Sequence, residues 1–492
     1  MTKPVTTVRP RHLFLWLATY FLLQICVRLS VTATAEYDEA EQVELTQQLL
    51  RGYGVQPPLY TWLQASVFAV CGLNLFSLAL LKNILLGGTF FFTYRTVKAM
   101  TGTVTTAAAA TVSIFFLPQI AWESQRDQSH SVLAVMLGAA TLLAFVRLAR
   151  SRSLADYVVF GFVAGLGCMS KYNYAVFLAG LLLASGWLKE FRPIVTNRRM
   201  LGAVAMLVVM LLPHGTWMWA HQSAVLSRVH ETVIEKPSWW LGSLAGLGSL
   251  VSAVVGFSAM AAVIYGAIFW RAQTVTMESS AARTHRRLVG ATMLAGLLIC
   301  AALAVFGQAR FKDRWMQPLL FMVPLWLALR VQARLDVGRW RWLRRLAVVV
   351  AVGILVAIAA TPHWALANRR LRYLNPDYSA FAAQIKAQGF TRGVMARDGH
   401  KLGGNLKLFF PDTPSLGADH PGFSAPTNVP LLVVWNAAGN AAGHDGLTNV
   451  VWQQRGVVLD ELTPTFVTVP YETLAEPAAK FGFVIIPPAK QP

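Results

Sequence analysis

The sequence has little charge. Asp, Glu, Lys and Arg together make up 13% of the 492 residues, whereas hydrophobic residues make up 55%. That charged share is about half of what a soluble domain carries. A soluble chain of this length would need more charge on its surface, so the composition excludes an ordinary cytosolic enzyme and a disordered protein. It favours a polytopic helical membrane protein.

Cysteine is also scarce. The four cysteines show no metal-ligand spacing and no Cys-x-x-Cys pair, which excludes a disulfide scaffold and a zinc module. Each lies within or beside an apolar segment, as expected of a small buried side chain. They are Cys26, Cys71, Cys168 and Cys300.

Acidic residues are the rarer charges, with 23 Asp and Glu against 43 Lys and Arg. The basic residues form short runs between apolar segments, as the positive-inside rule describes for membrane proteins. No basic run is long or interleaved with stacking aromatics, so we expect no nucleic-acid partner. The pattern predicts a lipid bilayer as the environment and a cytoplasmic N-terminus.

Stretches free of charged residues predict about eleven membrane spans, since a bilayer core needs about 20 apolar residues. The segments 157–169 and 174–188 are too short to cross alone, which indicates broken half-spans. Tyr60–Val70 is ambiguous. As a further span it would put Arg95 outside, whereas as a juxtamembrane helix it leaves every basic cluster on one side, and we favour that second interpretation. The predicted spans are His12–Thr32, Phe76–Val97, Val104–Ala121, Ser131–Val146, Tyr157–Met169, Tyr174–Leu188, Leu201–Trp219, Leu244–Phe269, Leu288–Phe306, Gln317–Leu329 and Leu346–Ala360.

The composition changes after Ala360. Short apolar runs between turn residues, such as 430–435 and 483–486, predict buried strands, and Tyr378–Gln388 predicts a helix. The predicted fold is mostly α: a bundle of about eleven spans, with about twelve or thirteen left open. Residues 1–360 form the transmembrane domain, and 33–75 are its first periplasmic loop with juxtamembrane helices. Residues 361–492 form a small α/β domain, which an odd span count places in the periplasm.

The first predicted outer loop is unusually acidic, with five acids in the nine residues 36–44. Glu41 and Glu44 are interpreted as the solvated face of a short helix. Asp38 and Glu39 lie within a few residues of the predicted outer end of a span. A carboxylate there costs free energy, so its presence indicates a functional role. We therefore expect these two to be functional.

Four short motifs follow one another on the predicted outer side: Asp38-Glu39, Gln56-Pro57-Pro58-Leu59, Arg126-Asp127 and a Gly-rich short span ending in Ser170-Lys171. In this order they resemble the C-type membrane glycosyltransferases, which include the protein O-mannosyltransferases and the lipid A aminoarabinose transferases. The motifs cover residues 12–190 and the topology covers 1–360. Gln56 departs from the charged pair that many relatives have before Pro-Pro, and Lys171-Tyr172-Asn173 replaces the commoner Lys-Gly-Pro.

The resemblance implies an inverting hexosyl- or pentosyltransferase of the bacterial inner membrane. Its donor would be a sugar on polyprenyl phosphate, and its acceptor would be lipid A, the lipopolysaccharide core, or another periplasmic glycan or protein. Asp38, with Glu39 beside it, would be the catalytic base. The Gln-Pro-Pro-Leu-Tyr motif resembles a subgroup that includes transferases of uronic acids onto lipopolysaccharide. The pattern requires no cofactor and leaves room for a divalent metal.

Cations near the outer span ends are candidates for holding the donor phosphate. Snorkelling is the alternative explanation for Arg28 and Lys82, and snorkelling or headgroup contact explains the loop 310–314 equally well. Lys171 lies between two half-length spans, where a cation is harder to explain by snorkelling. The predicted phosphate-binding residues are Arg28, Lys82, Lys171, Arg310, Lys312 and Arg314.

We also expect substrate contacts from Gln56, Tyr60, Arg126 and Asp127, with a surface ion pair or a helix cap as the alternative for the last two. The outer-loop histidines lack metal spacing and are interpreted as interfacial or acceptor-facing. They are His214, His221 and His230. In the tail, 398–400 and 403–405 are interpreted as a turn.

Two other functions explain part of the pattern. A transporter or flippase would account for the spans and the buried charges, but not for the outer domain, and transporters tend to have two related halves, which are not seen here. A sensor whose tail is the functional part would not explain the charged membrane loops. Sugar transfer in detergent, with no gradient present, would separate the enzyme from both.

Overall fold

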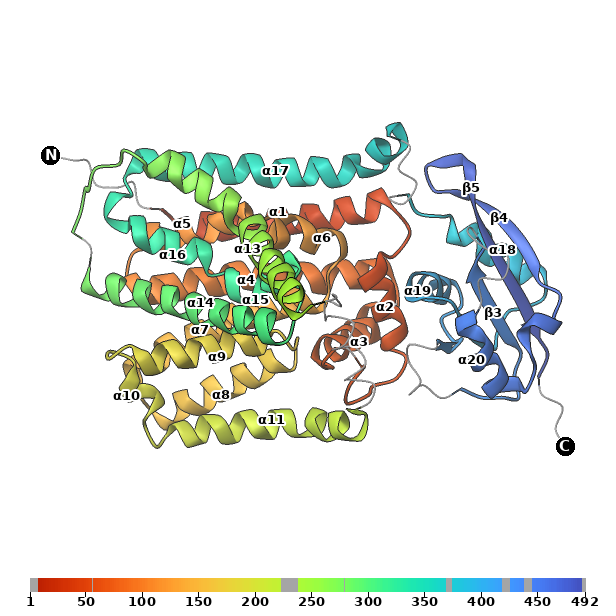
Figure 1. Cartoon of the computed structure of the whole chain (residues 1–492). Coiled ribbons are helices and arrows are strands. Elements are labelled where there is room, and N and C mark those ends of the chain that lie inside the picture. Colours follow the sequence, from red (N-terminus) through yellow and green to blue (C-terminus); the bar gives the residue numbers. More distant parts are fainter. Residues whose placement is uncertain are drawn as a thin grey trace. The chain divides into compact units, whose positions relative to one another are not determined.

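The computed structural model describes residues 8–54, 56–222, 238–277, 279–368, 374–417, 425–437 and 445–488. The chain is mostly helical with one small sheet near the C-terminus, as the sequence predicts (Figure 1). It divides into two compact units that interleave along the sequence. The bundle unit comprises Met1–Leu23, Gly54–Tyr60 and Lys82–Ile354, and the sheet unit comprises Gln24–Tyr53, Thr61–Leu81 and Leu355–Pro492. The predicted domain boundary at residue 360 stays a prediction.

Among the described residues, seven helices are long and apolar enough to cross a membrane. Two bent helix pairs, at 72° and 47°, raise this number to nine if each pair forms one span. Every segment predicted as a span falls on one of these helices or on the shorter apolar helices α8 (Leu154–Cys168) and α9 (Tyr174–Trp187). The seven are α1 (Pro10–Val31), α4 (Leu75–Thr101), α7 (His130–Ser151), α11 (Met200–Ala220), α13 (Trp239–Phe269), α14 (Ser280–Phe306) and α17 (Val337–Ala367).

Two of the predicted spans, Val104–Ala121 and Gln317–Leu329, lie on the two bent pairs. The first pair joins α5 (Val104–Val112) and η1 (Ser113–Phe116) to the π-helical η2 (Gln119–Glu123) and α6 (Ser124–Asp127). The second joins η3 (Asp313–Met316) and α15 (Gln317–Leu320) to α16 (Val323–Val331) and η4 (Gln332–Arg334). In both pairs a proline lies near the bend. Its ring and its missing N–H interrupt the hydrogen bonds of the helix, which favours a bend there. These prolines are Pro118 and Pro324.

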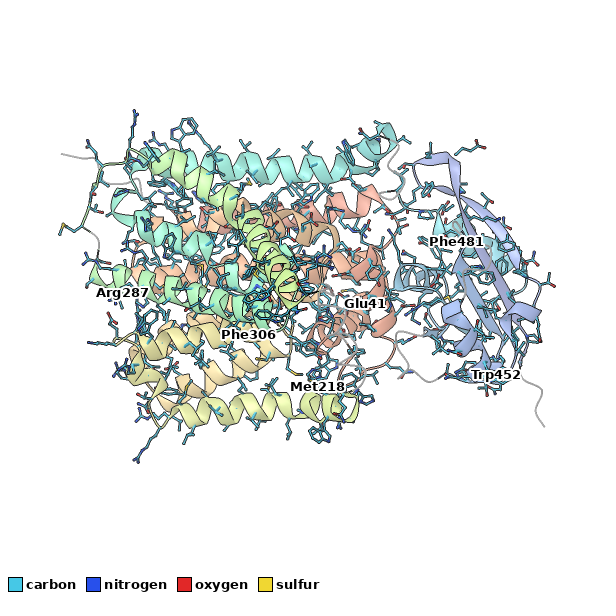
Figure 2. The ribbon with its side chains drawn as sticks, in the orientation of Figure 1. Glu41, Met218, Arg287, Phe306, Trp452 and Phe481 are labelled. Atoms are coloured by element: carbon cyan, nitrogen blue, oxygen red, sulfur yellow. The ribbon has the colours of Figure 1, made fainter. Side chains whose placement is uncertain are left out.

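Small residues allow close helix packing in the bundle unit. The helix α8 packs on α7 and α11, and α9 packs on α14. A Cβ at Gly161 would lie 2.1 Å from the carbonyl oxygen of Ala203, and one at Gly180 would lie 2.8 Å from that of Thr292. Close backbone approach of this kind holds membrane helices together. In Figure 2, Arg287 and Phe306 mark opposite ends of α14, one basic and one apolar.

The sheet unit holds a five-stranded mixed sheet in the order β2-β1-β3-β5-β4. The strand β1 pairs in parallel with β2 and β3, and β5 pairs antiparallel with β3 and β4. The strands are β1 (Val394–Arg397), β2 (Ser415–Leu416), β3 (Leu431–Asn436), β4 (Thr465–Tyr471) and β5 (Leu474–Ile486).

Both faces of the sheet are covered, which is why β3 reads as an unbroken apolar run. Leu431, Val433 and Trp435 enter one buried cluster, whereas Leu432 and Val434 enter the other. The helices α18 (Tyr378–Ala387) and α19 (His400–Phe409) line the second cluster, and α20 (Asp445–Arg455) lines the first. Figure 2 shows Phe481 on β5 and Trp452 on α20. The predicted strands and the helix at 378 are confirmed.

One tail prediction is wrong. Residues 403–405 were expected in a turn, but they lie inside α19. The turn comes earlier, at Gly399, whose φ of 80° is a left-handed conformation that glycine tolerates.

The segment 33–75, predicted as the first periplasmic loop, contains two short helices, as expected. They are α2 (Tyr37–Leu45) and α3 (Leu59–Cys71). The proline pair at 57–58 ends just before α3 begins, which agrees with the predicted helix start.

Candidate active site

Side-chain amides join two loops of the bundle unit that are far apart in the sequence. Gln119 Nε2 donates a hydrogen bond to Asp313 Oδ2 at 3.0 Å. Gln317 Nε2 donates to the carbonyl oxygen of Gln119 at 2.6 Å and to Gln128 Oε1 at 2.7 Å. The loop that carries Arg126 and Asp127 is therefore fixed to the start of η3. These neutral amides gave no signal in the sequence, although the π-helix η2 between them is a common mark of functional sites.

A second junction ties the loop after α8 to the same place. Asn173 Nδ2 donates to the carbonyl oxygen of Trp315 at 2.6 Å. Lys171 Nζ donates to Ser131 Oγ at 2.5 Å, and the Lys171 side chain is half-buried. The structure thus brings Lys171 close to the loop 310–315, two elements that the sequence put forward separately.

The Pro-Pro-Leu-Tyr motif joins this group from the other side. The Tyr60 ring lies 5.2 Å from the His130 ring, centroid to centroid, and Tyr60 is buried. The backbone N–H of Leu59 donates to the carbonyl oxygen of Met169 at 3.2 Å, two residues before Lys171. Gln56 is half-buried at the start of the motif.

The remaining predicted cations of this unit differ in their exposure. Arg310, Lys312 and Arg314 are exposed, and Lys312 Nζ lies 5.8 Å from the centroid of the Trp315 ring. Lys82 on α4 is only 2% exposed. Its neighbour Asn83 accepts a hydrogen bond from Gln125 Nε2 at 2.9 Å, which links α4 to the loop of Arg126.

Arg126 forms an ion pair with Glu123 at 3.3 Å, and its guanidinium lies 5.9 Å from the Trp122 ring centroid. Both side chains are partly exposed. Asp127 is half-buried at the C-terminal end of α6. The arginine therefore has a local partner three residues before it, at the end of η2.

Two of the three outer-loop histidines form part of an aromatic row. His214 stacks between Tyr172 and Trp217, with ring centroids 5.8 Å and 6.0 Å away, and His221 stacks on Trp217 at 4.6 Å. His230 lies outside the described residues. In the described part of the chain, no group of three or more His, Cys, Asp and Glu side chains could hold a metal ion.

In the sheet unit, two predicted site residues are paired with each other. Arg28 Nη2 donates to Glu39 Oε2 at 2.5 Å and to the carbonyl oxygen of Thr34 at 2.9 Å, and both charged side chains are buried. Glu39 Oε2 also accepts from the backbone N–H of Glu36 at 3.1 Å, which caps α2. Asp38, one residue earlier, is half-buried and lies on a different side of the helix.

Glu44 at the other end of α2 is completely buried, so its interpretation as a solvated residue is wrong. Its Oε1 accepts from Arg397 Nε at 2.8 Å and from Ser415 Oγ at 2.6 Å, and its Oε2 lies 2.5 Å from His400 Nδ1. Burial alone would raise the pKa of the Glu44 carboxyl, but the Arg397 charge and the His400 hydrogen bond outweigh it and hold that pKa below its usual range.

Two glycines let α19 lie directly against α2. A Cβ at Gly404 would be 2.2 Å from the carbonyl oxygen of Ala40, and one at Gly403 would be 2.0 Å from Glu44 Oε1. Asn405 Oδ1 accepts from the backbone N–H of Ala35 at 2.7 Å, and its Nδ2 donates to the Ala35 carbonyl oxygen at 3.0 Å. These contacts and the Glu44 ion pair form what we call the α2 clamp, which fixes the helix that carries Asp38.

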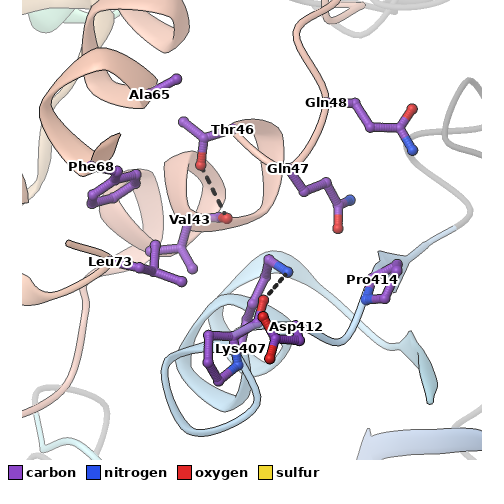
Figure 3. Close-up of a pocket in the computed structure, with 11 residues that line it drawn as sticks. Val43, Thr46, Gln47, Gln48, Ala65, Phe68, Leu73, Lys407, Asp412 and Pro414 are labelled. Carbon is purple, nitrogen blue, oxygen red and sulfur yellow. Dashed lines mark hydrogen bonds between the residues drawn. The ribbon is translucent and has the colours of Figure 1, made fainter. Parts of the chain in front are cut away.

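A cavity of about 340 Å³ opens beside the clamp (Figure 3). Phe68 from α3 and Val43 from α2 supply its apolar wall, while Gln48 and Asp412 supply polar groups. Lys407 from α19 donates to the carbonyl oxygens of Pro411 and Thr413 at 3.1 Å and 2.9 Å. A volume of this size can hold a sugar unit.

Comparison with known proteins identifies the family. Residues 55–219 match the model of the dolichyl-phosphate-mannose-protein mannosyltransferases. The chain is 33% identical over 432 residues to the lipopolysaccharide core galacturonosyltransferase RgtB of Rhizobium johnstonii, and the match covers 86% of each chain. The chain belongs to the C-type family of membrane glycosyltransferases. It is thus a multi-pass membrane glycosyltransferase, which confirms the predicted family and enzyme class.

A second relative supports this membership, and a solved structure shares the fold. The glycosyltransferase is 30% identical over 446 residues to the lipopolysaccharide core galacturonosyltransferase RgtA of the same organism, over 88% of each chain. The crystal structure of ArnT from Cupriavidus metallidurans bound to undecaprenyl phosphate matches with a TM-score of 0.59 and 12% identity, over 95% of this chain and 97% of that chain. This likeness confirms the predicted fold.

Proposed function

We propose that this enzyme transfers a sugar from a polyprenyl-phosphate carrier to a sugar of the lipopolysaccharide core or of lipid A, with inversion. The observation that carries the proposal is the junction around Lys171, where its loop is bonded to Trp315 beside three exposed cations. Cations held in this way suit an anionic lipid headgroup. The names of the two galacturonosyltransferase relatives make galacturonic acid the first sugar to test.

The donor phosphate is assigned to Lys171 and to the loop cations Arg310, Lys312 and Arg314. A phosphate is a good leaving group when cations bind the charge that develops on it as the glycosidic bond breaks. Lys82 is a weaker candidate because it is almost completely buried. Arg28 is left out of the donor site, because all three of its guanidinium nitrogens donate to Glu39, Thr32 or Thr34.

Asp38 is assigned as the catalytic base. The acceptor hydroxyl oxygen attacks the anomeric carbon, and its proton passes to the Asp38 carboxylate. The bond between that carbon and the phosphate oxygen breaks, and its electron pair leaves with polyprenyl phosphate. Because attack comes opposite the leaving group, the configuration inverts. Glu39 is a positioning residue in this scheme, since it pairs with Arg28 and caps α2.

The acceptor glycan is assigned to the cavity beside α2. Phe68 offers an apolar face against which a sugar ring can pack, and the Gln48 amide can bond hydroxyl groups. Val43 of the cavity lies on the same helix as Asp38, and Thr46 follows directly after that helix, so an acceptor of more than one sugar unit can reach from the cavity toward the base.

The test is sugar transfer by the purified enzyme in detergent, from polyprenyl-phosphate galacturonic acid to lipopolysaccharide that lacks this sugar. We expect transfer without any ion gradient. Asp38→Asn should reduce the transfer rate by about 10²- to 10⁴-fold, because it removes the base and keeps the size. It should still bind the donor.

The matched control is Glu190→Gln. This carboxylate is also partly exposed, but it pairs with Arg287 at 2.9 Å at the basic end of the bundle unit, and its removal should leave the transfer rate unchanged. Wild-type turnover in Asp38→Asn would remove the proposed base. No transfer by the wild-type enzyme with any polyprenyl-linked sugar would overturn the proposed donor class.

A further inference from the structure

A second cavity lies in the bundle unit, at the end opposite the donor cations. It has a volume of about 450 Å³ and opens between the first turns of α1 and α17. Its position follows from the path of the chain. The helix α14 runs from its basic end to the loop 310–314, and α15 and α16 then return to the basic end, where α17 begins. The proposed function assigns nothing to this cavity.

Three arginines and one histidine line the cavity, from α17 and from the start of α1 with the residue before it, two places more than 300 residues apart in the sequence. They are Arg9, Arg341, Arg344 and His12. Within the described part of the chain, none of the three guanidinium groups has a hydrogen bond or an ion pair. The residues before Val8 include no Asp or Glu. The cavity therefore has a positive charge that these parts of the chain leave uncompensated.

Neighbouring arginines on α17 behave differently. Arg339 forms an ion pair with Asp336, and Arg345 lies over the Trp342 ring at 5.7 Å from its centroid. Neither lines the cavity. If these arginines only snorkelled, we would expect all of them to behave alike. Instead, some arginines of α17 have a partner in the chain, and others line the cavity without one.

The rest of the lining is apolar and aromatic. Leu13 and Trp340 are buried, Trp16 is half-buried, and Val348 continues the lining one turn beyond Arg344. Beyond the cavity, α17 exposes Val349, Val352 and Val356 along its length, as expected of a helix face that meets acyl chains. Tryptophans at the boundary between basic and apolar residues mark a membrane interface.

We propose that this cavity binds an anionic glycerophospholipid, with its phosphate on Arg9, Arg341 and Arg344 and the start of an acyl chain against Leu13 and Val348. Basic pockets between membrane helices bind anionic headgroups for the same reason. A guanidinium fits a phosphate through paired N–H groups. The apolar half of the lining favours a lipid over inorganic phosphate, which would leave that half without a partner.

The test uses the full chain, purified in a zwitterionic detergent and examined by native mass spectrometry with added lipids. Dioleoyl phosphatidylglycerol is compared with dioleoyl phosphatidylcholine and inorganic phosphate. We expect phosphatidylglycerol to bind in preference to the other two. Arg341→Gln and Arg344→Gln should each weaken its binding by about five- to tenfold.

Arg345→Gln is the matched control, because it removes the same charge from the same helix outside the cavity, and it should bind phosphatidylglycerol as the wild type does. Val348→Asn should weaken the binding of phosphatidylglycerol without changing that of inorganic phosphate. Three results would overturn the proposal: equal binding of phosphatidylcholine, equal losses in Arg344→Gln and Arg345→Gln, or preferential binding of inorganic phosphate.

Discussion

The two units use charge in different ways. In the sheet unit, the charged groups around α2 are buried and paired with each other, as in Arg28–Glu39 and Glu44–Arg397. In the bundle unit, neutral amides hold the loops together, and the cations of the loop 310–314 remain exposed. A buried pair leaves no charge available for a ligand, whereas exposed cations on loops fixed by amides remain available. The comparison separates residues that position the site from residues that can bind substrate.

The largest effect on stability is expected at the buried end of α2. Glu44→Gln leaves the Arg397 guanidinium buried without its counter-charge, which typically costs about 3–5 kcal/mol. Hydrogen exchange at the amides of α19 should show this loss of opening free energy. The double variant Glu44→Gln/Arg397→Gln should lose less than the sum of the single variants. If the double variant lost as much stability as the two single variants together, the two residues would not act as a pair.

The donor cations should change affinity and leave stability almost unchanged. Lys171→Met, and separately Arg310→Gln with Lys312→Gln, should weaken binding of the lipid-linked sugar by about 1.5–3 kcal/mol, because each loses a charge-assisted hydrogen bond. Titration of the purified enzyme with donor measures this. Lys189→Gln removes an exposed lysine at the basic end and serves as the control. Normal donor binding in both variants would make these cations interface anchors only.

The pH dependence of stability should also separate the units. Because the folded pKa of Glu44 is below its unfolded value, the unfolded state binds more protons between the two values. The stabilisation by Glu44 is therefore complete above the unfolded pKa and is lost as the pH falls through the folded pKa. The protection factors of the α19 amides, which correct for the intrinsic exchange rate, should fall in acid in the wild type, with a shallower dependence in Glu44→Gln. If the wild type and Glu44→Gln depended on pH equally, groups other than Glu44 would control the loss of stability in acid.

The smallest effect is expected at an exposed pair. Arg287 and Glu190 meet at 2.9 Å in the bundle unit, and both side chains are well exposed. Surface ion pairs contribute about 0–1 kcal/mol, because water and salt screen them. Thermal unfolding of Glu190→Gln should match the wild type within that range. A loss as large as that of Glu44→Gln would remove the distinction between buried and exposed pairs.

Much of the candidate site was visible as separate motifs. Lys171 stands out by its position between two half-length spans, whereas Tyr60 and Asp127 belong to motifs that resemble those of the family. Their grouping was not predictable, because it depends on Gln119, Gln128 and Gln317, which are ordinary neutral residues in the sequence. Only the folded chain shows that their amides join loops about 190 residues apart.

The sequence by itself determined the class of fold, since the scarcity of charge and the length of the apolar runs leave few alternatives to a membrane bundle. It also determined the strands of the tail, because a short apolar run between turn residues has to be buried on both faces. The tertiary structure alone decided the roles of the charged residues. Whether Glu44 is solvated or Arg28 is free depends on which partner lies within about 3 Å, the range of a hydrogen bond. For Glu44 the partners Arg397 and His400 lie about 350 residues away along the chain, a separation at which local sequence pattern carries no information.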